Sequence, residues 1–177
     1  MKRGIFLSLI LILAVTLNIG CEALDFETDI TFELKFVAQS DTPDFNVIEL
    51  LDADSLSDNI AKYSDNIKNI EMLEVTYQIT SVGDSNMATV MQTATLSVAD
   101  ENGQGEAVIG SVSNQEIASL PTPLPLPLEQ EGMHRFEELV MNAPHRGLVK
   151  LTGNTDLAPT DFTVVFFITV NMTANPL

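Results

Sequence analysis

The sequence predicts a mostly β protein: a two-sheet antiparallel sandwich of about seven strands with one or two short helices. Three observations lead to this prediction. Apolar and polar residues alternate over several stretches, which is the period of a strand with one buried face. Turn-forming sequences separate these stretches at short intervals. The last stretch, residues 161–173, is apolar on both sides, which is typical of a central or covered strand.

The first predicted strand covers residues 30–38, ITFELKFVA, where every second residue is apolar. An acidic tether over residues 21–29 is expected to precede it. The sequence SDTPD at 40–44 has the composition of a turn. The apolar run FNVIELL at 45–51 is then expected to form a second, short strand.

Residues 56–70 carry apolar side chains at steps of three and four, the spacing of one helical face. The apolar positions are Leu56, Ile60, Tyr63, Ile67 and Ile70. Asp54 or Ser55 can cap the start of this helix, and the polar pair at 64–65 can divide it into two. The period changes to two over residues 73–79, with Leu73 on the apolar face. A helix packed across a sheet and leading into one of its strands is therefore predicted.

Residues 88–98 and 106–112 are predicted to form a hairpin about the turn DENGQG at 100–105. The next segment, LPTPLPLPL at 120–128, contains alternating prolines, which cannot donate to a sheet ladder. Two interpretations are open: a recognition segment for an aromatic groove, or an extended crossover whose leucines pack on the domain surface. The crossover is favoured.

A second helix is predicted over residues 133–142 and is ended by Pro144 just beyond it. Residues 147–153 and 161–173 follow as a pair of strands joined by a turn. We therefore expect a single β-sandwich domain over residues 30–177.

The N-terminus has the pattern of a secretory signal peptide. Lys2 and Arg3 precede an apolar run over residues 5–17, and a small residue, Gly20, stands before Cys21. The apolar run is shorter than the stretch of about 20 residues that a transmembrane helix requires. Residues 1–20 are therefore predicted to be removed, and the chain is predicted to be exported.

The five residues Leu17-Asn18-Ile19-Gly20-Cys21 resemble the lipobox of bacterial lipoproteins, although Asn18 stands where that pattern favours leucine. The resemblance implies covalent diacylglycerol and an N-acyl lipid such as palmitate on Cys21, with cleavage just before it. It also implies anchoring to the bacterial cell envelope, with the outer membrane as the expected location. A free thiol or an intermolecular disulfide is the alternative for this cysteine, the only one in the chain.

Two further blocks, residues 63–80 and residues 150–170, resemble small Gram-negative lipoproteins with immunoglobulin-like β-sandwiches. This resemblance implies an immunoglobulin-like fold and an envelope location. It transfers no active-site residues, because the shared features are patterns of helix, strand and hairpin.

The chain has 25 acidic and 8 basic residues and a net charge of −17. A field of this sign repels phosphate backbones, so no nucleic-acid partner is expected. It equally disfavours electrostatic docking to anionic lipid headgroups. The expected partners are a membrane, reached through the lipid anchor, and an envelope protein.

The sequence nominates no catalytic residue. His134 and His145 stand apart, without the carboxylates or further histidines of a known motif. A zinc site would require cysteines or paired histidines, and no nucleophile-elbow, phosphate-loop or dinucleotide fingerprint occurs. No cofactor is expected apart from the lipid on Cys21.

Acidic clusters supply the only metal-site candidates, and these are weak. The first contains Asp52, Asp54 and Asp58, and the second contains Asp100 and Glu106. The first cluster lacks the glycine and the glutamate that an EF-hand has at its sixth and twelfth positions. The alternatives are a helix cap and a solvated hairpin tip.

These observations favour a non-enzymatic, lipid-anchored envelope lipoprotein that acts as a binding or structural module. Two alternatives remain: a carrier of an apolar or lipid-like ligand between helix and sheet, and a hydrolase whose site the sequence does not reveal.

Overall fold

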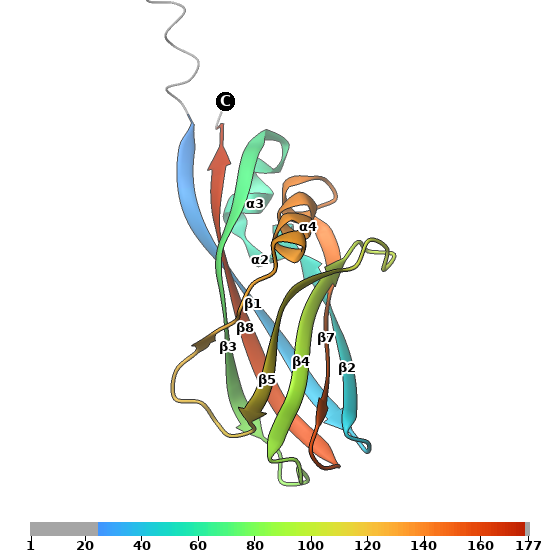
Figure 1. The fold of residues 1–177 in the computed structure, drawn as a ribbon. Coiled ribbons are helices and arrows are strands. Elements are labelled where there is room, and N and C mark those ends of the chain that lie inside the picture. Colours follow the sequence, from blue (N-terminus) through green and yellow to red (C-terminus); the bar gives the residue numbers. More distant parts are fainter. Residues whose placement is uncertain (1–24, 176–177) are drawn as a thin grey trace, which may run out of the picture.

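The structure, a computed structural model, describes residues 25–175, and these form two sheets with helices at one side (Figure 1). The strands are β1 (Phe26–Ser40), β2 (Asp44–Asp52), β3 (Ile67–Val82), β4 (Val90–Ala99), β5 (Ala107–Glu116), β6 (Leu124–Pro125), β7 (Arg146–Thr155) and β8 (Thr160–Ala174). The helices are α2 (Ala53–Leu56), α3 (Asp58–Tyr63), a 3₁₀ turn at Ser64–Asn66, and α4 (Gln130–Met141). The predicted signal peptide and Cys21 lie outside the described residues.

The first sheet has the order β1-β8-β3-β6 and the second β2-β7-β4-β5. All neighbours are antiparallel. The predicted mostly β, two-sheet antiparallel sandwich is therefore confirmed. Its connectivity differs from the immunoglobulin-like layout of four strands and three. The pairs β1·β8, β2·β7, β3·β6 and β4·β5 nest like one long hairpin folded over itself, which is the arrangement of a jelly roll.

Strand β8 is central, as its two apolar faces predict. It pairs with β1 on one side and with β3 on the other. Every second side chain of β8, including Phe166 and Ile168, points into the sandwich. Ile168 is completely buried. Val165 is only 6% exposed although it faces outward. Its cross-strand partners are Lys35 on β1 and Gln78 on β3.

Strand β1 begins at Phe26, four residues before the predicted start, so the tether predicted over residues 21–29 is too long. The alternation continues backward because Glu27 and Asp29 occupy outward positions, where charge meets water. Phe32 and Phe36 occupy inward positions and are completely buried.

The predicted helix over 56–70 is wrong in its second half. Ser57 has extended backbone torsions, with φ −146° and ψ 116°, and so separates α2 from α3. Its hydroxyl caps α3 by accepting a hydrogen bond from the Ile60 amide at 3.3 Å. Strand β3 already begins at Ile67, where pairing with β8 takes over from helical propensity.

The face predicted for β3 is also interrupted. A register shift between Met72 and Glu74 inserts a bulge into its pairing with β8. Met72 is consequently buried, whereas Leu73, predicted to point inward, is 48% exposed.

Helix α4 packs across β3 and β5, close to the end where β1 starts (Figure 1). Phe136 and Val140 are completely buried, and the Phe136 ring meets Phe32 edge-on with 5.8 Å between centroids. A Cβ on Gly132 would collide with the carbonyl oxygen of Val108, so only glycine permits this close approach. None of the helices among residues 25–175 has both the length and the apolar character of a membrane span.

The proline-rich segment follows the edge of β3, as the crossover interpretation predicts. The Leu120 amide donates to the Ile79 carbonyl, and the Leu126 amide donates to the Val75 carbonyl, each at 2.9 Å. Leu126 is only 6% exposed. The segment therefore covers an edge that would otherwise be open.

Candidate functional site

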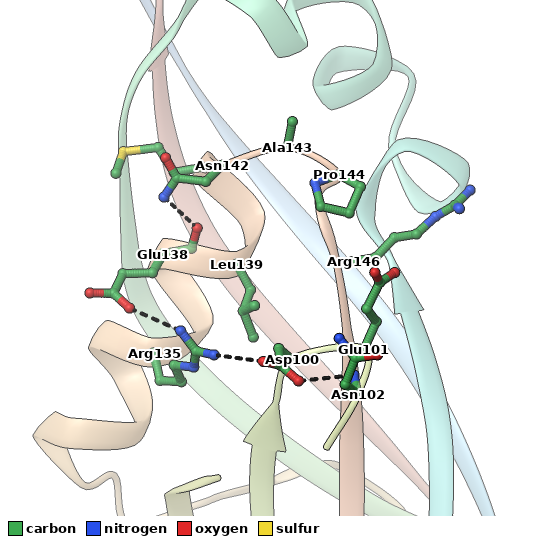
Figure 2. A pocket seen from close by; sticks show the side chains of 11 residues that line it. Asp100, Glu101, Asn102, Arg135, Glu138, Leu139, Asn142, Ala143, Pro144 and Arg146 are labelled. Carbon is green, nitrogen blue, oxygen red and sulfur yellow. Dashed lines mark hydrogen bonds and ion pairs between the residues drawn. The ribbon is translucent and has the colours of Figure 1, made fainter. Parts of the chain in front are cut away.

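A groove lies between α4, the turn after β4 and the start of β7 (Figure 2). Its volume is about 440 Å³. Its walls are formed by Asp100, Glu101, Asn102, Arg135, Glu138, Leu139, Met141, Asn142, Ala143, Pro144 and Arg146. Charged and amide groups thus stand beside a short apolar wall.

Arg135 is the central charge of this groove. Its guanidinium lies between two carboxylates, 3.3 Å from Glu138 and 3.9 Å from Asp100 (Figure 2). It also donates to the Gln104 carbonyl at 3.5 Å. The buried Nε atom has no hydrogen-bond partner. Arg135 therefore links helix α4 to the β4–β5 turn.

The turn itself is held by Asp100. One carboxylate oxygen accepts hydrogen bonds from the Asn102 amide at 2.9 Å and the Gln104 amide at 2.8 Å. Gly103 and Gly105 have φ values of 76° and 63°, a left-handed conformation that side chains disfavour. The predicted hairpin turn is thus present, and its acidic residue serves the turn.

A smaller cavity of about 180 Å³ lies on the outer face of the β2-β7-β4 part of the second sheet. Its lining residues are Ile48, Ser97, Ala99, Gly103, Glu106, Leu148 and Lys150. Ser97 is 2% exposed and donates to Glu106 at 2.6 Å, while the Lys150 ammonium lies 3.3 Å from the same carboxylate. The hydrogen bond from Ser97 lowers the pKa of Glu106 against the opposing effect of burial, and Lys150 assists.

Three of the five residues considered for calcium, Asp52, Asp100 and Glu106, form hydrogen bonds or ion pairs within the protein. Asp52 caps α2 through the Ser55 amide and bonds Arg146 at 2.9 Å. Burial raises the pKa of Asp52, but the hydrogen bonds from Arg146 and Ser55 outweigh it, so the pKa is lowered. Asp54 and Asp58 lie in the first turns of α2 and α3.

Asp100 and Glu106 are engaged by the turn amides, Ser97 and Lys150, as described above. Within residues 25–175, no three histidine or acidic side chains come together in a group that could hold a metal ion. A cation would have to displace protein donors at Asp100 and Glu106, whereas the buried Oδ1 atom of Asp54 has no hydrogen-bond partner among the described residues.

The two histidines lie in different environments. His134 is exposed on α4, with its ring 3.0 Å from Glu137. His145 is 5% exposed, and its Nδ1 atom lies 2.7 Å from the Val140 carbonyl. The structure does not bring them together.

Sequence reasoning missed both hollows, because each depends on segments far apart in the chain. Arg135 and Lys150 carried no motif that could mark them. The exposure of Ile48 and Leu50 on β2, at 52% and 55%, was not predicted either, because the run at 45–51 indicated a short strand without indicating which residues it exposes.

No protein-family model matches the sequence, and no curated protein matches it. Similar solved structures include one of turnip yellow mosaic virus, with 8% identity, a TM-score of 0.38, and 86% of this chain and 95% of that chain covered. Another is a nodavirus particle of the prawn Macrobrachium rosenbergii, with 10% identity, a TM-score of 0.42, and 88% and 97% covered. A third is TcaA-TcaB of Yersinia pseudotuberculosis, with 13% identity, a TM-score of 0.38, and 94% and 11% covered. At such scores these likenesses carry no argument, and the fold assignment rests on the strand order above.

Proposed function

We propose that this protein is a non-enzymatic lipoprotein of the bacterial cell envelope, anchored through lipid on Cys21 and serving as a binding module. The observation that carries the proposal is the position of Cys21, directly after a signal-peptide pattern and five residues before strand β1. A protein held this way needs no spanning helix. Two or three acyl chains on one residue provide stable attachment, whereas a single chain holds only marginally.

The short connection limits how far the start of β1 can lie from the anchor. Five extended residues reach at most about 18 Å, so Phe26 stays within that distance of the modified cysteine. Phe26 pairs with Ala174 at the end of the sandwich near α3 and α4 (Figure 1). That end is therefore expected to lie nearer the membrane than the opposite end, which carries the loops at 41–43, 83–86 and 156–159.

The packing of α4 supports a surface binding module over a ligand carrier. Phe136 and Val140 fill the space between α4 and the sheets, and Gly132 lies against the β5 backbone. The two hollows described above are open to solvent instead. The eleven groove-lining residues offer charges and amides, and none of them is a serine, threonine, cysteine or histidine.

The anchor is tested by replacing Cys21 with serine. The variant is expected to lose incorporation of an alkynyl palmitate analogue and to move from the membrane to the soluble fraction. Asn18→Leu is the matched control, and it should keep both properties. Unchanged labelling of Cys21→Ser would overturn the proposed anchor.

A further inference from the structure

Strand β2 forms one edge of the second sheet, and no other strand among residues 25–175 pairs with its outer side. Its pairing with β7 is regular from Asp44 to Asp52, without a register shift. Such a regular edge presents a row of N–H and C=O groups that can accept another strand.

Two hydrogen bonds define which backbone groups are free. The Thr155 amide donates to Pro43 at 3.0 Å, and the Ala53 amide donates to His145 at 2.9 Å. In an antiparallel ladder, residues alternate between bonding the partner strand and pointing away from it. The odd-numbered residues of β2 therefore bond β7, and the even-numbered residues direct their N–H and C=O groups to the open edge. The Asp44 carbonyl already accepts a hydrogen bond from the Ser40 hydroxyl at 2.7 Å, so the groups open to a partner strand are those from Asn46 to Leu50.

The same even-numbered residues carry an exposed apolar patch. Ile48 and Leu50 are 52% and 55% exposed. Leu50 lies opposite Leu148 on β7, and Leu148 in turn lies opposite Ala99 on β4. Backbone groups ready for pairing and apolar side chains ready for burial thus coincide on one strand.

The other sheet edges are protected. The proline-rich segment and β6 cover β3. The Glu129 amide bonds the Ile109 carbonyl of β5, and Leu128 forms a bridge with Gly110. Strand β1 carries Glu27, Asp29, Glu33 and Lys35 at its outward positions, which is a common protection against edge pairing. Between Asn46 and Leu50, the outward positions of β2 have no charge.

The charges around β2 indicate what kind of strand would pair with it. Asp44 and Asp52 stand at its two ends, and Glu49 lies on the opposite face from Ile48 and Leu50. Glu49 forms no ion pair within the described chain. Basic side chains on a partner strand would complement these carboxylates, whereas a second copy of a chain with net charge −17 would be repelled.

We propose that β2 accepts an extended segment of a protein partner as a fifth strand of the β2-β7-β4-β5 sheet. The segment has apolar residues alternating with lysine or arginine, so that apolar side chains cover Ile48 and Leu50 while basic ones face Glu49. The proposal rests on the proposed binding-module function and names its partner class. Backbone hydrogen bonds supply affinity, and the alternating side chains supply specificity.

The test uses the full chain as purified in detergent and a fluorescent nonapeptide in which valine alternates with lysine. Anisotropy should show saturable binding, and hydrogen exchange over residues 45–51 should slow in the complex. A peptide with glutamate in place of lysine should not bind.

Three variants locate the binding site. Leu50→Lys is expected to weaken binding at least about tenfold, because it removes apolar burial and adds like charge. Asn46→Pro removes an edge N–H without taking a bond from β7, and it should also block binding. Leu73→Lys changes a similarly exposed leucine on the other sheet and should bind as the parent does. Melting curves check that each variant is folded. If Asn46→Pro does not fold, the peptide affinity of Leu50→Lys alone tests whether the partner strand binds at β2.

Equal binding of the glutamate peptide, equal binding by Leu50→Lys, or no saturation at millimolar peptide would overturn the proposal. Sedimentation showing a dimer that Leu50→Lys dissociates would assign the edge to a second copy instead and also overturn it. Cys21→Ser separates the two proposals, since it should lose the lipid while keeping peptide binding.

Discussion

Phe136 joins helix α4 to the core, and truncating it is expected to destabilise the whole sandwich. The side chain is completely buried and packs edge-on against Phe32 of β1, while the helix itself contacts β3 and β5. Phe136→Ala removes most of a buried aromatic ring and leaves a cavity that the rigid sheets cannot close. Such substitutions cost about 3–5 kcal/mol of unfolding free energy. For a domain of this size, Tm should fall by roughly 10 °C.

Urea unfolding followed by circular dichroism measures this effect. Phe136→Leu is the matched variant, because it keeps most of the apolar volume and should lose less than half as much stability. A loss below about 1 kcal/mol for Phe136→Ala would refute the reasoning, since it would mean that α4 can detach or repack freely. Proteolysis of Phe136→Ala would show whether the helix opens alone or with the sheets. Cleavage confined to α4 would indicate that the helix opens alone, and cleavage throughout the domain would indicate that the sheets open with it.

Two further outcomes are expected. Asp156 accepts hydrogen bonds from the Thr89 side chain and from the Val90 and Thr89 amides, which lower its pKa to about 2. Its stabilising effect should be complete above the unfolded pKa of 3.8 and vanish as pH falls through about 2, so the Tm difference between the parent and Asp156→Asn should shrink over that range. Gly132→Ala should lower Tm although alanine favours helix, because its Cβ would collide with the Val108 carbonyl; an increase in Tm would contradict the close packing.

Local patterns predicted much of this fold. The two apolar faces of residues 161–173 indicated a central strand, and β8 is central. The proline pattern at 120–128 indicated a surface crossover, which runs along β3. These features depend on the chain's own alternation or on proline's missing donor, so a sequence can reveal them.

Other features depend on contacts between distant segments, and the sequence could not reveal them. Ile67 fits a helical spacing, yet its pairing with β8 makes it a strand residue. Leu73 fits the inward face of β3, yet a bulge turns it outward. The jelly-roll order arises because β1 pairs with β8 and β2 with β7, and alternation identifies strands without identifying their partners.

The candidate sites also combine features that a local sequence pattern predicts with features that depend on contacts between distant segments. The acidic turn at 100–105 was predictable from its composition, and its aspartate does hold the turn. The groove beside it exists because Arg135 reaches that turn from α4. The open edge of β2 could be recognised only after its neighbours were known, since FNVIELL alone predicts a short strand and says nothing of its place in a sheet.

The central claim, lipid attachment at Cys21, is tested most directly by the intact mass and N-terminal fragment spectrum of the protein isolated from bacterial membranes. The expected product is a chain that begins at Cys21 and carries diacylglycerol and an N-linked acyl group. A chain that retains residues 1–20, or that begins elsewhere with an unmodified cysteine, would contradict it.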